Sequence, residues 1–214
     1  MRQDTGVDMT ELARRAGALV DRAGPGGRSI LGIAGPPGAG KSTVAAKLAE
    51  ALGPDGAVVV PMDGFHLAGA ELVRLGRVDR KGAPDTFDAA GYTALLRRLR
   101  EPGGRPVYAP AFDRSLDEPI AASIAVPAHV PLVITEGNYL LHDAGEWARV
   151  RPLLDEAWYL APDGGLRIGR LVDRHVRHGK DPAHARAWVV RSDEANARLI
   201  APGRGRADLV LDTG

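Results

Sequence analysis

The sequence contains no cysteine and very little lysine. The absence of cysteine excludes disulfide bonds and thiolate-bound metal sites. The 28 basic residues are nearly all arginine, with lysine only at positions 41, 47, 81 and 180. Because a compact ammonium on a flexible stem cannot be replaced by a guanidinium fork at every site, Lys41 is a candidate for a specific role.

Long apolar runs and a surplus of charge are absent as well. The longest apolar stretches are far shorter than the ~20 residues that a membrane span requires. The N-terminal MRQDTGVDMTELARR has no apolar segment of the kind found in secretory signals. The 28 basic residues are balanced by 27 acidic ones, so no basic surface for duplex nucleic acid is expected. We therefore expect a cytoplasmic protein without membrane or nucleic-acid partners, and the oligomeric state stays open, with a homodimer as one option.

The length of 214 residues suits a single α/β domain, residues 1–214. Apolar runs predict strands at 29–35, 57–61, 131–135, 156–161 and 207–212. Amphipathic spacing predicts helices at 10–23, 42–52, 66–76, from Asp88, 147–154, 163–178 and from Asp181. This alternation is typical of a five-stranded parallel sheet with helices on both faces and an active site beyond the carboxyl ends of the strands.

Two segments lie outside this regular alternation. RPVYAPAFDR and PIAASIAVP read as the two strands of a small hairpin-like insertion at 105–127. The helical segment at 163–192 is rich in arginine and follows the fourth strand, so we predict that it forms a lid over the site.

The segment GPPGAGKS, residues 35–42, fits the Walker A pattern G-x-x-x-x-G-K-S/T of P-loop proteins. An apolar strand precedes it and a helix follows it, which is the setting that its mechanism requires. The glycines let backbone amides converge on phosphate oxygens beside the positive end of the helix. Lys41 would bridge the phosphates of a nucleoside triphosphate, and the Ser42 hydroxyl would ligate Mg²⁺. The predicted nucleotide-binding residues are Gly35, Pro36, Pro37, Gly38, Ala39, Gly40, Lys41, Ser42 and Thr43.

Two carboxylates directly follow predicted strands, Asp63 in VVVPMDGFH and Glu136 in PLVITEGNYLL. A parallel sheet delivers both to the edge that carries the glycine-rich loop. One carboxylate can hold Mg²⁺ while the other accepts a proton from an attacking hydroxyl. We assign Asp63 as the base, since it leads into the loop expected to face the substrate, and Glu136 to the metal.

An arginine stripe forms the third signal. Arginines recur at 167, 170, 174 and 177 on one side of the predicted helix. Such a stripe can neutralise charge that develops in a transition state, or it can be a solvated helix face. We select Arg170 and Arg174 as the catalytic candidates.

Together, PMDGFH, RKGAPDTFD, PVYAPAFDR, TEGNYLL and the arginine helix resemble the uridine kinase, phosphoribulokinase and pantothenate kinase superfamily, in particular its short bacterial members. The resemblance implies a P-loop NTPase fold and an ATP-dependent kinase that phosphorylates a small-molecule hydroxyl. It implies that Asp63 acts on that hydroxyl, with Phe65 and His66 lining the acceptor pocket. The family's substrate loop corresponds to Arg80–Asp88, its hairpin residues to Tyr108 and Arg114, its metal-binding acid to Glu136 and its lid arginines to Arg170 and Arg174.

The substrate loop departs from the uridine kinase pattern. Uridine kinases carry His-Pro-Asp-x-Phe-Asp, whereas this chain has GAPDTFD without the histidine. RKGAPDTFD is closer to pantothenate kinases, which are longer chains. The acceptor is therefore a nucleoside, a sugar or a pantothenate-like compound. The choice between ATP and GTP as the phosphoryl donor is also left open. From a different class, the alternative is a nucleotide-dependent switch or regulatory NTPase, although no N-K-x-D guanine-reading motif occurs.

Overall fold

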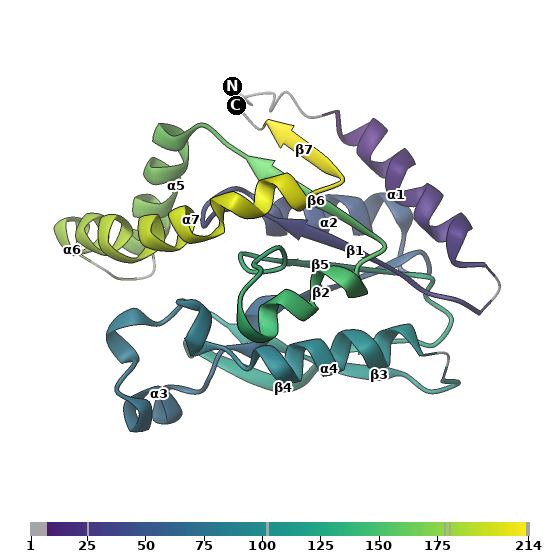
Figure 1. The fold of residues 1–214 in the computed structure, drawn as a ribbon, viewed down its shortest axis with the longest axis horizontal. Helices are drawn as coiled ribbons and strands as arrows, with labels where there is room; N and C mark the ends of the chain where they lie inside the picture. Colours follow the sequence, from purple (N-terminus) through teal and green to yellow (C-terminus); the bar gives the residue numbers. More distant parts are fainter. Residues whose placement is uncertain (1–7, 25, 102, 178, 180, 213–214) are drawn as a thin grey trace.

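The computed structural model describes residues 8–24, 26–101, 103–177, 179 and 181–212. Its centre is a five-stranded parallel sheet with the strand order β2-β5-β1-β6-β7 (Figure 1). The strands are β1 (Ser29–Ala34), β2 (Ala57–Pro61), β5 (Leu132–Gly137), β6 (Glu156–Ala161) and β7 (Leu209–Asp212). The prediction of a five-stranded parallel sheet is confirmed.

Helices cover both faces of the sheet. On one face, Leu31 and Ile33 of β1 pack with α1 (Met9–Ala23) and α2 (Lys41–Leu52) in a buried apolar cluster. On the other face, Ile30 of the same strand packs with α4 (Ala89–Arg100). Strands buried on both faces need apolar residues at successive positions, which explains why they read as continuous apolar runs.

A two-stranded antiparallel hairpin of β3 (Val107–Asp113) and β4 (Glu118–Val126) forms a separate small sheet, as predicted. The hairpin crosses close to the turn after β2. A Cβ on Gly64 would lie 2.3 Å from the carbonyl oxygen of Pro110, so only glycine permits this approach. The close crossing brings the end of β3 beside Asp63.

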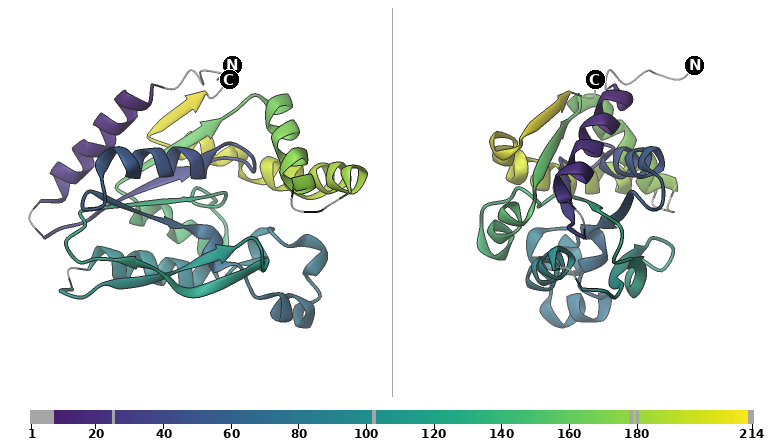
Figure 2. Two further views of the ribbon diagram at one scale, coloured as in Figure 1. Left: turned by 180° about the vertical axis from the view of Figure 1, so that it is seen from behind. Right: turned by 90° about the vertical axis from the view of Figure 1, so that its right-hand side faces the viewer.

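The C-terminal helices α5 (Gly164–Arg177), α6 (Pro182–Trp188) and α7 (Glu194–Ile200) follow β6, with one π-helical turn at Val189–Asp193. Asp181 caps α6 as predicted by accepting from two backbone amides. The predicted helix end at residue 178 lies outside the described residues. Figures 1 and 2 show α5 and α6 at the same end of the molecule as α3 (Gly69–Leu75). None of the helices in the described ranges combines the length and the apolar character needed to cross a membrane.

One predicted helix is wrong. Residues 147–154 form two short 3₁₀ turns, Gly145–Arg149 and Arg151–Leu153, in place of a continuous helix. Pro152 has no amide hydrogen and its ring clashes with the preceding helical turn, so the apolar spacing of this segment does not produce an α-helix.

Candidate active site

Strand register brings the predicted site segments to one edge of the sheet. Glu136 of β5 is in register with Pro61 of β2 on one side and with Ile33 of β1 on the other. The glycine-rich loop, residues 35–43, starts just beyond Ile33, and Asp63 lies just beyond Pro61. The two carboxylates and the loop therefore share the carboxyl edge of three adjacent strands.

Lys41 is the first residue of α2 and is only 8% exposed. Its Nζ donates to the carbonyl oxygens of Gly35 and Pro36 at 3.0 Å each, and to Oδ1 of Asn138 at 2.7 Å. Burial lowers the pKa of the Lys41 ammonium, while the charges of Glu136 and Asp63 oppose this effect. The loop thus surrounds a desolvated cation with neutral oxygens, an arrangement suited to an incoming anion.

The conformation of the glycine-rich loop leaves space at the start of α2. Gly40 has φ 87°, a value that favours glycine, and a Cβ built on it would meet no atom within 4 Å. No side chain among the described residues caps this helix. Its first backbone amides therefore point into open space at the positive end of the helix, which is a ready site for phosphate.

Glu136 and Ser42 form the second polar pair. The Ser42 hydroxyl donates to Oε1 of Glu136 at 2.9 Å, and Glu136 is 5% exposed. Burial and the nearby charge of Asp63 raise the pKa of Glu136, while Lys41 opposes the rise. A buried carboxylate beside a hydroxyl supplies two oxygen ligands of the kind that Mg²⁺ prefers. The residues present fit Mg²⁺ bound together with nucleotide phosphates.

Asp63 occupies a more open position than Glu136. It lies in a 3₁₀ turn, Met62–Phe65, and its side chain is 34% exposed. Its Oδ2 lies 3.7 Å from Nη2 of Arg114, the residue that follows β3. Arg174 of α5 is half-buried. Burial and then the charge of Arg114 lower the pKa of its guanidinium, while the charges of Asp193, Asp63 and Glu136 oppose this shift. Arg114 and Arg174 are thus within electrostatic reach of each other and of the two carboxylates.

Phe65 and His66 lie behind Asp63, within an aromatic cluster. The Phe65 ring meets Tyr92 edge-on at a centroid distance of 5.2 Å. The His66 ring lies 3.9 Å from Phe87 and 4.9 Å from Phe112, between centroids. Burial lowers the pKa of His66 to about 4, so the imidazole is neutral at pH 7. These rings form a largely apolar wall beside the carboxylate.

Three predicted site residues form no hydrogen bond or ion pair with Asp63 or Glu136 within the described part of the chain. Arg80 pairs with Asp85 at 2.7 Å and lines a hollow of about 270 Å³ against the C-terminal helices. Tyr108 is 56% exposed at the opposite end of β3 from Arg114, about 20 Å along the strand. Arg170 is exposed on α5.

Sequence reasoning missed contacts on the C-terminal helices. Arg167 is 6% exposed and donates to the carbonyl oxygen of Pro37 at 3.3 Å, and it forms an ion pair with Glu194. Its spacing of four residues from buried Leu171 was a signal that it shares the inward face of α5. Asn196 of α7 is likewise buried, being 8% exposed, and donates to the carbonyl oxygen of Gly82.

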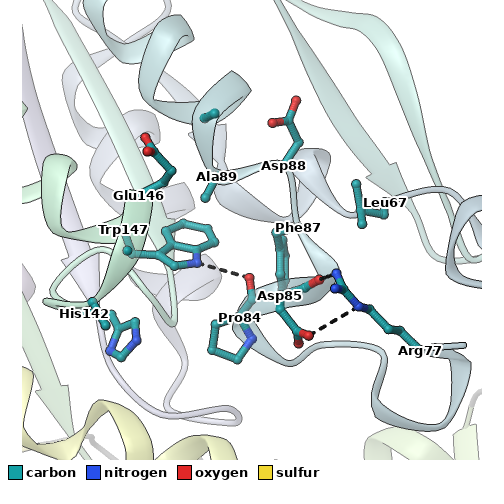
Figure 3. A pocket seen from close by; sticks show the side chains of 13 residues that line it. Leu67, Arg77, Pro84, Asp85, Phe87, Asp88, Ala89, His142, Glu146 and Trp147 are labelled. Carbon is teal, nitrogen blue, oxygen red and sulfur yellow. Dashed lines mark hydrogen bonds and ion pairs between the residues drawn. The ribbon is translucent and has the colours of Figure 1, made fainter. Parts of the chain in front are cut away.

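A hollow of about 550 Å³ lies between residues 84–90 and residues 142–147 (Figure 3). The indole nitrogen of Trp147 donates to the carbonyl oxygen of Pro84 at 3.1 Å, and Nε of Arg77 lies 3.4 Å from Oδ2 of Asp85. The walls come from these segments and from the start of α4, not from the glycine-rich loop. Residues 84–88 are thus anchored to the body of the protein on the side that faces Trp147.

Proteins of known family are similar to this chain in sequence and in fold. The profile of the phosphoribulokinase/uridine kinase family matches residues 30–214. A Schizosaccharomyces pombe protein described as a uridine kinase is 33% identical over 194 residues, which cover 86% of this chain and 83% of the relative. The pantothenate kinase of Leifsonia xyli is 29% identical over 209 residues, covering 85% of this chain and 65% of that protein. A solved structure from Silicibacter sp. TM1040, described as a fructose transport system kinase, has a TM-score of 0.84 at 37% identity, covering 95% of this chain and 98% of the other.

Proposed function

Since the chain belongs to the phosphoribulokinase/uridine kinase family and has its P-loop kinase fold, we propose that it transfers the γ-phosphoryl group of Mg·ATP to a small-molecule hydroxyl. The acceptor is a nucleoside, a sugar or a pantothenate-like compound. One observation carries the proposal: the glycine-rich loop with buried Lys41, the Ser42–Glu136 pair and the more open Asp63 converge at one edge of the sheet.

The glycine-rich loop binds the triphosphate in this proposal. In this structure the Lys41 ammonium donates to two carbonyl oxygens of the loop and to Asn138. Because an ammonium has three N–H donors, phosphate oxygens would replace some of these acceptors when the triphosphate binds. The amides at the start of α2 add uncharged donors. Ser42 and Glu136 would hold Mg²⁺, which when bound neutralises phosphate charge. Arg174 adds positive charge from α5 on the side of the two carboxylates.

Asp63 orients the acceptor hydroxyl and accepts its proton at a carboxylate oxygen. Its greater exposure relative to Glu136 suits contact with a diffusible acceptor, and Arg114 restrains the carboxylate from the hairpin side. The Glu136 carboxylate accepts a hydrogen bond from Ser42. This contact favours a metal-binding role for Glu136 and the role of general base for Asp63. A general base of this kind contributes about 10²–10⁴-fold to rate.

The hairpin insertion, 105–127, and the lid, 163–192, complete the proposed domain 1–214. The hairpin supplies Arg114 from the acceptor side, and the lid supplies Arg174. Water must be excluded while the γ-phosphoryl group is transferred, since water would otherwise compete with the acceptor hydroxyl. Contact of Arg167 with the Pro37 carbonyl holds the lid on the glycine-rich loop.

A pantothenate-type acceptor is a more specific second proposal. The pantothenate kinase relative aligns over 85% of this chain, although the chain spans 65% of its length. The sequence RKGAPDTFD also lies nearer to the pantothenate kinase pattern than to the uridine kinase pattern.

The test is ADP release from Mg·ATP across a panel of nucleosides, pantothenate, and free and phosphorylated sugars. One compound should raise turnover far above the rate without acceptor. Lys41→Met and Asp63→Asn should remove that increase. A rate that no compound raises, through a widened panel and with nucleotide still bound, would favour a nucleotide-dependent switch.

A further inference from the structure

A single backbone carbonyl in the acceptor loop, residues 80–88, receives donors from two parts of the fold. The Gly82 oxygen accepts from the Tyr139 hydroxyl at 2.5 Å and from Nδ2 of Asn196 at 3.2 Å. Tyr139 follows β5 and belongs to the body of the protein, whereas Asn196 belongs to α7. Gly82 has φ 99°, a value that glycine adopts readily, and this backbone conformation presents its carbonyl to both donors.

The other side of α7 is tied to the glycine-rich loop. Glu194, two positions before Asn196, pairs with Arg167, and Arg167 donates to the Pro37 carbonyl. The helix α5 that carries Arg167 packs closely on this loop: a Cβ on Gly38 would lie 2.8 Å from Cγ of Leu171. A short helix of seven residues therefore contacts the nucleotide side through Glu194 and the acceptor side through Asn196.

Further contacts make α5, the π-helical turn and α7 one unit. His175 of α5 meets Asp193 at 3.1 Å between Nε2 and Oδ2, both side chains being largely buried. The junction with the acceptor loop is less filled. Arg80, Arg191 and Asn196 line the hollow of about 270 Å³ that separates the loop from α7. The acceptor loop is thus held by specific hydrogen bonds across a partly open contact with α7.

We propose that α7 couples occupancy of the glycine-rich loop to the position of the acceptor loop, with Asn196 as the positioning residue. The inference rests on the proposed function, because it takes residues 80–88 as the acceptor loop. Phosphate bound next to Pro37 shifts or immobilises the Arg167–Glu194 pair, and α7 passes this change to Gly82 through Asn196. Linkage is reciprocal, so acceptor binding also tightens nucleotide binding. Such coupling aligns the acceptor only when the lid is in place, which limits hydrolysis without acceptor.

The test is hydrogen exchange in the full chain, followed at residues 77–88 with and without Mg·ADP. In the unsubstituted protein, Mg·ADP should slow exchange of the acceptor-loop amides about fivefold or more, the lower range of coupling between sites. Asn196→Leu keeps a side chain of similar size but removes the donor, and it should abolish this slowing while ADP still binds. Asn196→Ala is the second variant, with the same expectation, and Arg198→Ala, on an exposed position of the same helix, is the control that should retain it.

Tyr139→Phe separates coupling from simple anchoring. It removes the donor from the body of the protein, so exchange of the loop should rise with and without ADP while the ADP-dependent difference persists. If Asn196→Leu and Asn196→Ala fold, bind ADP and still show the full slowing, the proposal is overturned. It is equally overturned if ADP binds the unsubstituted protein and leaves exchange of the loop unchanged.

Kinetics provide a second readout with the acceptor that the panel identifies. Loss of one hydrogen bond should raise the acceptor KM at saturating ATP about fivefold in Asn196→Leu. By linkage, the ATP KM at saturating acceptor should rise by a similar factor, while ADP affinity without acceptor stays unchanged. A purely structural role would lower the active fraction and leave both KM values unchanged. Hydrogen exchange needs only ADP binding, so a failed kinase assay and a failed coupling experiment are distinct results.

Discussion

The nucleotide side and the acceptor side of the candidate site are built differently. Lys41 and Glu136 are 8% and 5% exposed and are fixed by hydrogen bonds at the end of the central sheet. Asp63 and Arg114 are 34% and 50% exposed in their side chains and lie on a turn and after a hairpin strand. Under the proposed function, rigid elements thus serve the part shared by all triphosphate reactions, whereas turns and loops serve the part that selects an acceptor.

Asp63→Asn should produce the largest loss of activity, and this loss should concern only the acceptor side of the site. The amide cannot accept the hydroxyl proton, so kcat should fall by about 10²–10⁴-fold. ADP affinity should stay unchanged, because Asp63 is not in the glycine-rich loop. Steady-state rates and calorimetric ADP titration measure the two quantities. A comparable loss of ADP affinity would show that the two sides are not separable in this way.

Lys41→Met should damage the nucleotide side, with turnover falling by about 10²–10³-fold because a preorganised charge at the phosphates is lost. Thermal stability should not fall with it. The Lys41 ammonium is desolvated, which is the main reason for its lowered pKa. Removing the cost of that burial offsets the loss of its hydrogen bonds to Gly35, Pro36 and Asn138. Turnover and Tm are measured together. A large drop in Tm would mean that Lys41 stabilises the fold itself.

His66, in the aromatic cluster behind Asp63, should make the free energy of unfolding depend on pH. The pKa of His66 is lowered from 6.5 to about 4 by burial, so the unfolded chain binds a proton that the folded chain resists. Stability should therefore be full above pH 6.5, fall as the pH drops toward 4 and then level off, with a loss of about 3 kcal/mol.

His66→Phe should flatten this part of the pH profile, because phenylalanine keeps an aromatic ring between Phe87 and Phe112 without a titratable group. His129→Asn, at a side chain that is 63% exposed, is the matched control and should leave the profile unchanged. Denaturant unfolding between pH 4 and pH 7.5 gives the comparison. An equal slope in His66→Phe and the unsubstituted protein would assign the dependence to other groups.

Arg114→Gln should give the smallest effect, a rise of about tenfold in the acceptor KM, the scale of one hydrogen bond to a charged group. The ATP KM should change little, since Arg114 comes from the hairpin. Full kinetics with both substrates varied will separate the two constants. A change in the ATP KM alone would move Arg114 to the nucleotide side.

The parts of the structure also differ in how much of them could be predicted from the sequence. The strands and the glycine-rich loop are local patterns, apolar runs and a motif in its strand–helix setting, and these were predicted with their positions. Asp63 and Glu136 could be paired because parallel strands share a carboxyl edge, and the register confirms their common edge.

Contacts between distant segments could not be predicted in this way. Asn196 looks like a surface residue of a polar helix, and only the packing of α7 against the acceptor loop shows that it is buried. Arg167 and Arg170 share one stripe in sequence, yet Arg167 is buried against the glycine-rich loop and Arg170 is exposed. Residues 147–154 carry apolar spacing suited to a helix, but Pro152 prevents a continuous helix and two 3₁₀ turns form instead.

We propose that the two sides act together to move a phosphoryl group to a hydroxyl. The most direct measurement follows γ-labelled ATP and records whether the label appears in an acceptor from the panel or as inorganic phosphate. We predict label in one acceptor, in equal amount to the ADP formed, and its loss in Asp63→Asn. Label found only in inorganic phosphate, at a rate that no acceptor changes, would contradict the kinase assignment.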